Sequence, residues 1–317
     1  MLHIEKYKEE KKSEWNQFCA SAKNTMFMFQ RDYMEYHSDR FKDFSLMFYD
    51  DEKLIAILPM NIAGHVLYSH QGLTYGGFLI DKKMKQKTMN ECVKEFIKYA
   101  RREEITSVIY KLIPHIYHNV PSEEDQYALF LNGAKLLKIE PATVVRLSNL
   151  LNKSRGRKSQ INRAIREGVV ICELTEEKDY YDFISLQNQV LKKRHNTVAV
   201  HSGKEIFLLH SKFPENIRLF AAFYNSEMVA GTIVYEYQNV VHTQYLAAND
   251  IARKIGALDL CIDYVIKCFQ KNKEWLDFGI STEENGRKLN QGLISQKEGF
   301  GGRTVVYSTC ILDLLEK

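Results

Sequence analysis

The sequence predicts an α/β protein that consists of two similar domains, residues 1–150 and 151–317. The chain of 317 residues is long enough for two domains of ordinary size. One order of elements occurs twice, at residues 44–112 and again at 217–280: a β-hairpin, a strand, a glycine loop, a helix and a strand. The hairpin sequence DEKLIAILP of the first half resembles NSEMVAGTI of the second. An offset of roughly 170 residues is too long for a solenoid repeat and indicates a duplicated domain.

The composition is that of a soluble globular protein, with 45% hydrophobic and 26% charged residues. A net charge of +4 allows anionic ligands but does not indicate a surface coated with nucleic acid. Six scattered cysteines without a CxxC pair predict buried thiols in a reducing compartment, with no disulfide or zinc framework. The N-terminal MLHIEKYKEEKK lacks the apolar core of a secretory signal, and no apolar run is long enough to span a membrane. We therefore expect a cytoplasmic protein without a bound metal.

In the first half, residues 44–49 and 54–62 form the predicted hairpin, and residues 107–112 form a buried strand. Residues 83–102 have the period of an amphipathic helix, with lysine and glutamate opposite an apolar face. The apolar face consists of Met89, Cys92, Val93, Phe96, Ile97 and Ala100. We expect this face to pack on the core of the first domain.

In the second half, the predicted elements begin with a strand and a basic stretch and end with a strand. In order they are residues 142–147, the basic stretch 153–166, 169–173, the long helix 176–194, the short helix 204–210, the hairpin 217–223 and 228–237, the strand 240–247, the helix 258–269 and the strand 275–280. The helix 258–269 is apolar nearly all round. Its narrow polar stripe, Asp259, Asp263, Lys267 and Gln270, predicts burial against a sheet.

The loop before that helix has the composition of a phosphate site. Gly256 and Ala257 carry little side chain, so their backbone N–H groups can approach a ligand at the positive end of the helix dipole. Arg253 and Lys254 add positive charge, and Ile255 completes the loop. The same residues also fit a plain connection from strand to helix with two solvated basic side chains.

Two charged residues near the C-terminus lie in apolar or glycine-rich surroundings. Lys297 follows Leu293-Ile294 and precedes Phe300, and a lysine in such a setting can stabilise a developing oxyanion. A surface lysine is the common alternative. Asp277 lies in an apolar strand, where it can orient an amine or accept its proton, or serve as a structural carboxylate bonded to backbone.

These residues carry a resemblance to a known family. WLDFGIS followed by N-x-G-L-x-x-x-K-x-x-F-G-G, which includes Asp277 and Lys297, resembles the C-terminal signature of the FemABX-like acyltransferases of the GNAT superfamily. SRGRKSQINRAIREGV is similar to the basic helix that opens the second domain in that family, and residues 253–257 resemble the GNAT pyrophosphate loop. The resemblance implies two tandem GNAT-like domains, each a mixed, mostly antiparallel sheet flanked by helices, and transfer of an acyl group to an amine.

The resemblance also implies roles for particular residues. Lys297 and Asp277 would be catalytic, and Arg253, Lys254, Ile255, Gly256 and Ala257 would bind the donor. Arg157 and Arg163 match basic substrate-contacting positions, with a solvated helix face as the alternative. His242 and Tyr245, on the strand before the loop, are further candidates for substrate contact; a structural role is the alternative for His242. The corresponding loop of the first half, Tyr75-Gly76-Gly77-Phe78, has no basic residue like Arg253, so the first domain is predicted to be degenerate for donor binding.

The predicted donor is acyl-CoA, with acetyl-CoA first, and the acceptor is an amine of a small molecule or a cell-wall precursor. One alternative is a FemX-like ligase that uses aminoacyl-tRNA and acts on a peptidoglycan precursor. Several such enzymes have a long coiled-coil arm, whereas residues 176–194 here form a single helix, which favours acyl-CoA. A second alternative is a non-catalytic protein of this fold that binds an anionic partner through its basic helix.

Overall fold

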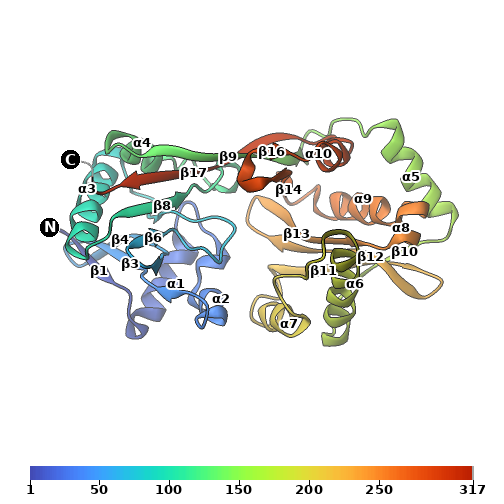
Figure 1. The fold of residues 1–317 in the computed structure, drawn as a ribbon, viewed down its shortest axis with the longest axis horizontal. Coiled ribbons are helices and arrows are strands. Elements are labelled where there is room, and N and C mark those ends of the chain that lie inside the picture. The colour runs from blue at the N-terminus through green and yellow to red at the C-terminus, as the bar shows by residue number, and fades with distance from the viewer. Residues whose placement is uncertain (316–317) are drawn as a thin grey trace. The chain divides into compact units, whose positions relative to one another are not determined.

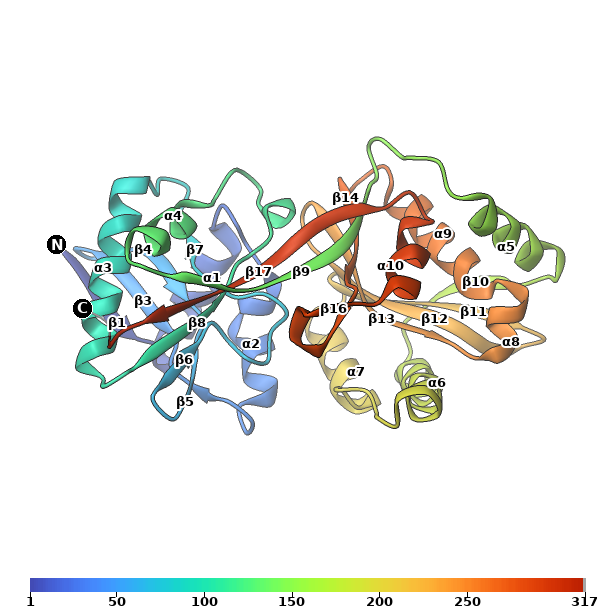
Figure 2. The same ribbon diagram turned by 45° about the horizontal axis from the view of Figure 1, so that its top comes forward.

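The computed structural model describes residues 1–315 and divides into two compact units. Unit 1 contains Met1–Glu140, Glu284–Gly286 and the described residues from Val306 onward, and unit 2 contains Pro141–Glu283 and Arg287–Val305. Figures 1 and 2 label the elements of both units. Unit 1 is discontinuous in sequence because the C-terminal strand returns to it. The predicted domains, residues 1–150 and 151–317, do not assign the C-terminal strand to the first domain.

Unit 1 has strands in two groups and helices packed against them. One sheet has the order β1 (Leu2–Lys6), β3 (Leu46–Asp50), β4 (Lys53–Leu58) and β7 (Leu79–Ile80). The other group runs from β17 (Arg303–Asp313) through β8 (Ser107–Lys111), β6 (Val66–Tyr68) and β5 (Asn61–Ala63) to β2 (Lys42–Asp43). The helices are α1 (Lys12–Ser21), α2 (Arg31–Met34), α3 (Gln86–Arg102) and α4 (Glu124–Leu131).

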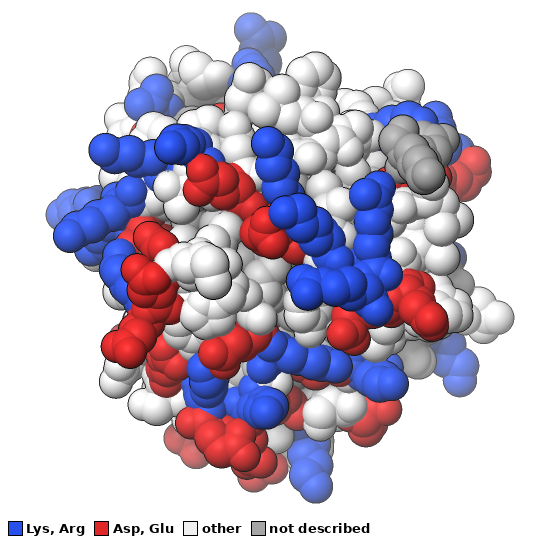
Figure 3. All heavy atoms as spheres, turned by 90° about the vertical axis from the view of Figure 1, so that its left-hand side faces the viewer, with Lys and Arg blue, Asp and Glu red and all other residues white. Residues whose placement is uncertain are grey.

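Helix α3 has the predicted amphipathic pattern, and all six residues of its predicted apolar face are buried. They join a core cluster with β3, β4, β8 and the buried side of α4. Figure 3 shows the outer face of unit 1 around α3, where Lys and Arg side chains alternate with Asp and Glu. This face of unit 1 therefore carries both signs of charge and is not uniformly basic.

Unit 2 is one twisted sheet with helices on both faces. The strand order is β10 (Val170–Leu174), β11 (Ile217–Tyr224), β12 (Glu227–Glu236), β13 (Val240–Ala248), β14 (Trp275–Ile280) and β9 (Lys135–Arg146). Adjacent strands are antiparallel except for the parallel pair β13–β14. Helices α5 (Arg155–Arg166) and α9 (Ala257–Phe269) lie on one face, and α6 (Glu177–His195) and α7 (Gly203–Lys212) lie on the other (Figure 1). The remaining elements are α8 (Asp250–Ile255), α10 (Gln291–Glu298) and the short pair β15 (Thr282–Glu283) and β16 (Lys288–Leu289).

The two aspartates of the polar stripe of α9 pair with basic residues in or before α5, whereas Lys267 and Gln270 are exposed. Asp263 forms ion pairs with Lys153 at 2.8 Å and with Lys267 at 2.7 Å, and Asp259 forms one with Arg157. The apolar remainder of α9 packs on β11, β12 and β13. The helix is therefore buried on the sheet, as predicted, while two of the basic residues before and within α5 are neutralised by carboxylates of α9.

The cysteines are all free thiols, and their burial differs from the expectation. Cys19, Cys92 and Cys261 are buried, but Cys268 is exposed on α9. The part of the chain that the structure describes contains no helix with the length and apolar character needed to cross a membrane.

Candidate active site

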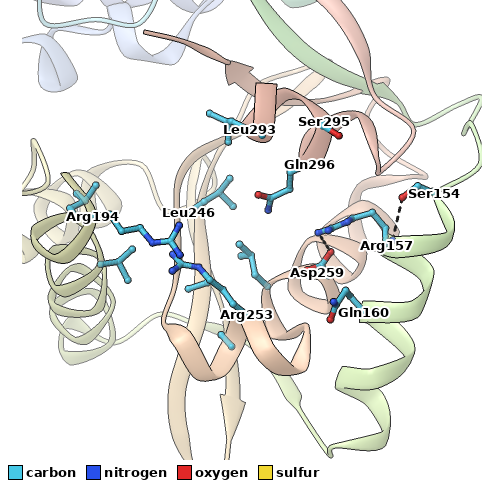
Figure 4. Close-up of a pocket in the computed structure, with 17 residues that line it drawn as sticks. Ser154, Arg157, Gln160, Arg194, Leu246, Arg253, Asp259, Leu293, Ser295 and Gln296 are labelled. Carbon is cyan, nitrogen blue, oxygen red and sulfur yellow. Dashed lines mark hydrogen bonds and ion pairs between the residues drawn. The ribbon is translucent and has the colours of Figure 1, made fainter. Parts of the chain in front are cut away.

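A cavity of about 660 Å³ lies in unit 2 between α5, α6, the end of β13, α8, α9 and α10. Three arginines, Arg157, Arg194 and Arg253, line this cavity, which we call the arginine cavity (Figure 4). Asp259 is the single carboxylate among the lining residues. The lining therefore carries excess positive charge, which is the electrostatic requirement for binding an anion.

Two of the arginines come from opposite walls. Arg194 projects from the end of α6 and Arg253 from α8, and their guanidinium groups extend toward each other in Figure 4. Arg253 has one weak ion pair, at 3.5 Å, with Asp250 on its own helix. Two like charges that face each other are unfavourable, and an anion between them would relieve the repulsion.

The third arginine is already paired. Arg157 of α5 binds the Asp259 carboxylate on the first turn of α9, and its guanidinium also lies 5.9 Å from the centre of the Phe300 ring. Burial raises the pKa of the Asp259 carboxyl, and the positive charge of Arg157 opposes that increase. This ion pair joins α5 to α9 at the edge of the cavity.

The predicted phosphate loop has a different conformation from the one expected. Arg253, Lys254 and Ile255 lie in α8, and Gly256 has a φ of 80° between α8 and α9. A Cβ atom on Gly256 would lie 2.3 Å from the Gln160 carbonyl oxygen of α5, and Ala257 is fully buried. Of the five predicted donor-binding residues, only Arg253 lines the cavity. The Cβ side of Gly256 faces α5, and Lys254, Ile255, Gly256 and Ala257 lie outside the lining of the cavity.

Arg163 lies on the exposed side of α5, where its guanidinium donates a hydrogen bond of 2.8 Å to the Lys254 carbonyl oxygen. This bond satisfies the C-terminal end of α8. Arg163 and Lys254 thus connect α5 to α8, outside the lining of the cavity.

A second cluster lies where the parallel pair β13–β14 ends. The register pairs His242 with Asp277, and beyond this point β14 is irregular, with Gly279 at a φ of 69°. The buried Asp277 accepts a hydrogen bond of 2.7 Å from the Gly279 N–H, and its other oxygen lies 3.3 Å from His242 Nδ1. Asp277 therefore fixes both the bend in β14 and the orientation of the imidazole ring.

Lys297 of α10 joins the same cluster. Its Nζ donates hydrogen bonds to the carbonyl oxygens of Gly279 at 3.0 Å and Ile280 at 2.6 Å, and only 5% of the residue is exposed. Burial lowers the pKa of Lys297 to about 8, and the negative charge of Asp277 opposes the decrease. The structure thus brings together Lys297, Asp277 and His242, whereas Tyr245 contacts His201, which lies just before α7.

No protein-family model matches this sequence, and no curated protein matches it. Among solved structures, the fold is similar to the crystal structure of FemX, with a TM-score of 0.69 and 10% identity over 98% of this chain and 97% of that one. The chain has the tandem GNAT fold of FemX. It is also similar to a tandem GNAT protein from the clavulanic acid biosynthesis pathway, with a TM-score of 0.56 and 10% identity over 99% of both chains.

L-PGS from Bacillus licheniformis is a third similar structure, with a TM-score of 0.59 and 15% identity over 83% of this chain and 82% of that one. The predicted fold class, two GNAT-like domains with mixed, mostly antiparallel sheets flanked by helices, is confirmed. At these identities the similarity establishes the FemABX-like tandem GNAT fold. It does not establish the reaction or the substrates.

Sequence reasoning missed the part of the cavity that comes from α6 and α10. Arg194 is the next-to-last residue of α6, and Gln296 precedes Lys297 on α10; both point into the cavity in Figure 4. Arg194 follows Lys192 and Lys193 in a run of charges that is typical of a solvated helix end. No local pattern distinguishes a helix end that faces a cavity from one that faces water.

The glycine loop of unit 1 is packed closed. A Cβ atom on Gly76 would lie 2.0 Å from the Ser69 carbonyl oxygen, and one on Gly77, at a φ of 94°, would lie 2.7 Å from the Tyr110 hydroxyl. The Phe78 N–H donates a hydrogen bond of 2.7 Å to the same hydroxyl. Donor binding by unit 2 alone stays a prediction. The close packing around Gly76 and Gly77 favours this prediction.

Proposed function

We propose that this protein transfers an acyl group from acyl-CoA to an amine, and that the arginine cavity of unit 2 binds the phosphate groups of the donor. The observation that carries this proposal is the pair of guanidinium groups, Arg194 and Arg253, that face each other at the first turn of α9. Planar guanidinium groups bind phosphate oxygens in pairs of hydrogen bonds. Helix α10 borders the same cavity and carries Lys297, so one element connects donor binding with the second cluster.

The reaction requires a neutral amine and a stabilised oxyanion. The amine nitrogen attacks the thioester carbonyl carbon, the oxygen gains negative charge, and the C–S bond then breaks to release the coenzyme thiolate. An ammonium group has three N–H donors, and Lys297 uses two of them on Gly279 and Ile280. We assign the third to the developing oxyanion, which matches the role expected from the sequence.

The proton of the attacking amine needs an acceptor. His242 Nδ1 lies 3.3 Å from an Asp277 carboxylate oxygen, and the imidazole ring lies beside Gly279, whose carbonyl oxygen accepts a hydrogen bond from Lys297. We therefore assign proton acceptance to His242, with Asp277 as the residue that positions it. This differs from a direct role for Asp277, whose two oxygens are turned to Gly279 and to His242.

The acceptor is the amine of a small molecule or of a cell-wall precursor, and acetyl-CoA is the first donor to test. A second candidate donor is aminoacyl-tRNA, and a specific observation favours it: Arg155, Lys158 and Arg166 are exposed on α5, next to the arginine cavity. Exposed basic side chains along a helix suit the backbone of an RNA. The fold is also similar to that of FemX, and a FemX-like ligase is the tRNA-dependent alternative that the sequence leaves open.

Ligand-induced stabilisation separates these donors. At about 100 times its Kd, a bound ligand adds about 2.7 kcal/mol to the free energy of unfolding, which a thermal melt detects. We expect stabilisation by acetyl-CoA and coenzyme A that is lost in Arg253→Ala and Arg194→Ala. Arg166→Ala, which is exposed outside the cavity lining, is the matched control and should respond to coenzyme A like the wild type.

Stabilisation by aminoacyl-tRNA without any response to coenzyme A would identify aminoacyl-tRNA as the donor. In that case Arg166→Ala should weaken the binding of aminoacyl-tRNA. No response to either donor would contradict the proposal and favour the non-catalytic alternative.

A further inference from the structure

Helix α4 and the start of β9 expose an unusual number of large apolar side chains on unit 1. Phe130 is 71% exposed, and five neighbours in sequence are between 44% and 57% exposed: Tyr127, Leu131, Leu136, Leu137 and Ile139. We call these six residues the α4–β9 patch. Helix α4 buries Ala128 and Leu129 toward α3 and the core, so its other face is turned to solvent. Apolar surface of this extent on a protein marks an interaction site.

The patch contains a hollow as well as protruding side chains. A groove of about 290 Å³ lies beside Phe130, and most of its lining is apolar: Leu112, Leu129, Ala134, Leu136, Ile139 and Cys310. Leu112, which follows β8, and Ser308 and Cys310 of β17 also line the groove. A projecting ring and an apolar groove therefore lie side by side on one surface.

The charges around the patch identify its partner. Of the charged residues in 123–140, Asp125 and Glu140 are buried, and only Glu123 and Lys135 are exposed, so this surface has no excess of positive charge for an anionic membrane. The two signs lie at opposite ends of α4: Glu123 is exposed before its first turn, and Lys135 is exposed just after its last. A surface with an acidic end, a basic end, a projecting ring and an apolar groove can pair with a second copy of itself across a two-fold axis.

We propose that the α4–β9 patch is the interface at which two copies of this chain form a dimer, with the two α4 helices antiparallel across a two-fold axis. Phe130 of each copy packs over the groove of the other, and Glu123 of each copy faces Lys135 of the other. This arrangement removes the apolar side chains of both copies from water, which is the main driving force for association. It is independent of the arginine cavity, which belongs to unit 2.

The mass in solution tests the proposal. We expect sedimentation or light scattering of the full chain to give twice the chain mass of 37.0 kDa. Phe130→Glu should raise the dimer Kd at least about thirtyfold, the effect of losing a central anchor. Because Phe130 is highly exposed, this substitution should leave the melting temperature of the monomer unchanged. Val200→Glu, at an equally exposed valine of unit 2, is the matched control and should remain dimeric.

Charge reversal tests the antiparallel geometry. Glu123→Lys and Lys135→Glu should each weaken the dimer, and the double variant should restore it, because the two charges meet across the interface. A wild-type monomer at about 100 µM, or a Phe130→Glu variant that remains dimeric, would overturn the proposal. Monomeric wild type that floats with phosphatidylcholine–phosphatidylglycerol vesicles would also overturn it and assign the patch to a lipid surface.

Discussion

Replacing Lys297 by methionine tests the electrostatics of the second cluster without knowledge of the acceptor. Burial places the pKa of Lys297 at about 8, against 10.5 for an unperturbed lysine. This difference corresponds to about 3 kcal/mol by which the charged form destabilises the folded protein at neutral pH. Methionine removes that cost but leaves two carbonyl oxygens without a donor, at about 1–3 kcal/mol each. The two effects nearly cancel, so the variant should fold at pH 7.

The pH dependence gives the sharper expectation. Between pH 8 and 10.5 the unfolded lysine holds its proton and the folded lysine has lost it, so the wild type gains stability as pH rises. Below pH 8 both states are protonated and the cost of burying the charge is complete; above 10.5 both are neutral and the cost is absent. The free energy of unfolding of the wild type minus that of Lys297→Met should therefore increase by about 3 kcal/mol from pH 7 to 10.5.

The two tryptophans make this measurement possible, because Trp15 belongs to unit 1 and Trp275 to unit 2. In a Trp15→Phe background, urea unfolding followed by tryptophan fluorescence reports unit 2 alone. Other groups that titrate over this range are common to both proteins and cancel in the difference. Parallel pH profiles for the two proteins would refute the reasoning and show that Lys297 is not held in a charge-destabilising site. If the proposed function is correct, the same variant should also lose about 10²–10³-fold in turnover with acetyl-CoA.

Two further substitutions have matched controls within the chain. Gly256→Ala should destabilise unit 2 by about 3 kcal/mol, because its φ is 80° and the new Cβ meets a carbonyl oxygen of α5, as measured by the urea midpoint of Trp275 fluorescence. Gly168→Ala, with a φ of 79° and no atom within 4 Å of the new Cβ, should cost only about 1 kcal/mol; equal costs would mean that α5 does not press on α9. Asp259→Asn should tighten coenzyme A binding about tenfold in calorimetry, because it removes the one carboxylate of the arginine cavity. Asp263→Asn, whose carboxylate pairs with two lysines away from the cavity, should leave the affinity unchanged, and a weaker complex for Asp259→Asn would contradict the assignment.

The local period of apolar residues predicts some helices and gives no signal for others. The apolar face of α3 and the near-complete burial of α9 follow from residues spaced three and four apart, so both could be predicted. The segment that contains α4 has no such clear period, and its exposed face could not be anticipated. The stripe of Asp259 and Asp263 was recognised, but the sequence does not show that a basic helix about 100 residues earlier pairs with it.

The candidate site shows the same division. The sequence alone identifies the types of residue: a lysine among apolar neighbours, an aspartate within a strand, and basic residues beside Gly256. The sequence does not identify the groups that these residues contact. Arg194, Gln160 and the carbonyl groups that bind Lys297 come from elements that are distant in sequence.

The sequence by itself determined the tandem arrangement of elements, the amphipathic faces and the chemical groups available near the C-terminus, because these depend on the order and spacing of residues. Only the tertiary structure decided that α5 closes over Gly256, that three arginines meet in one cavity, and that the last strand returns to unit 1. The physical reason is that side-chain period identifies which residues share a face, whereas the element that covers that face is selected by packing and charge pairing across the whole chain.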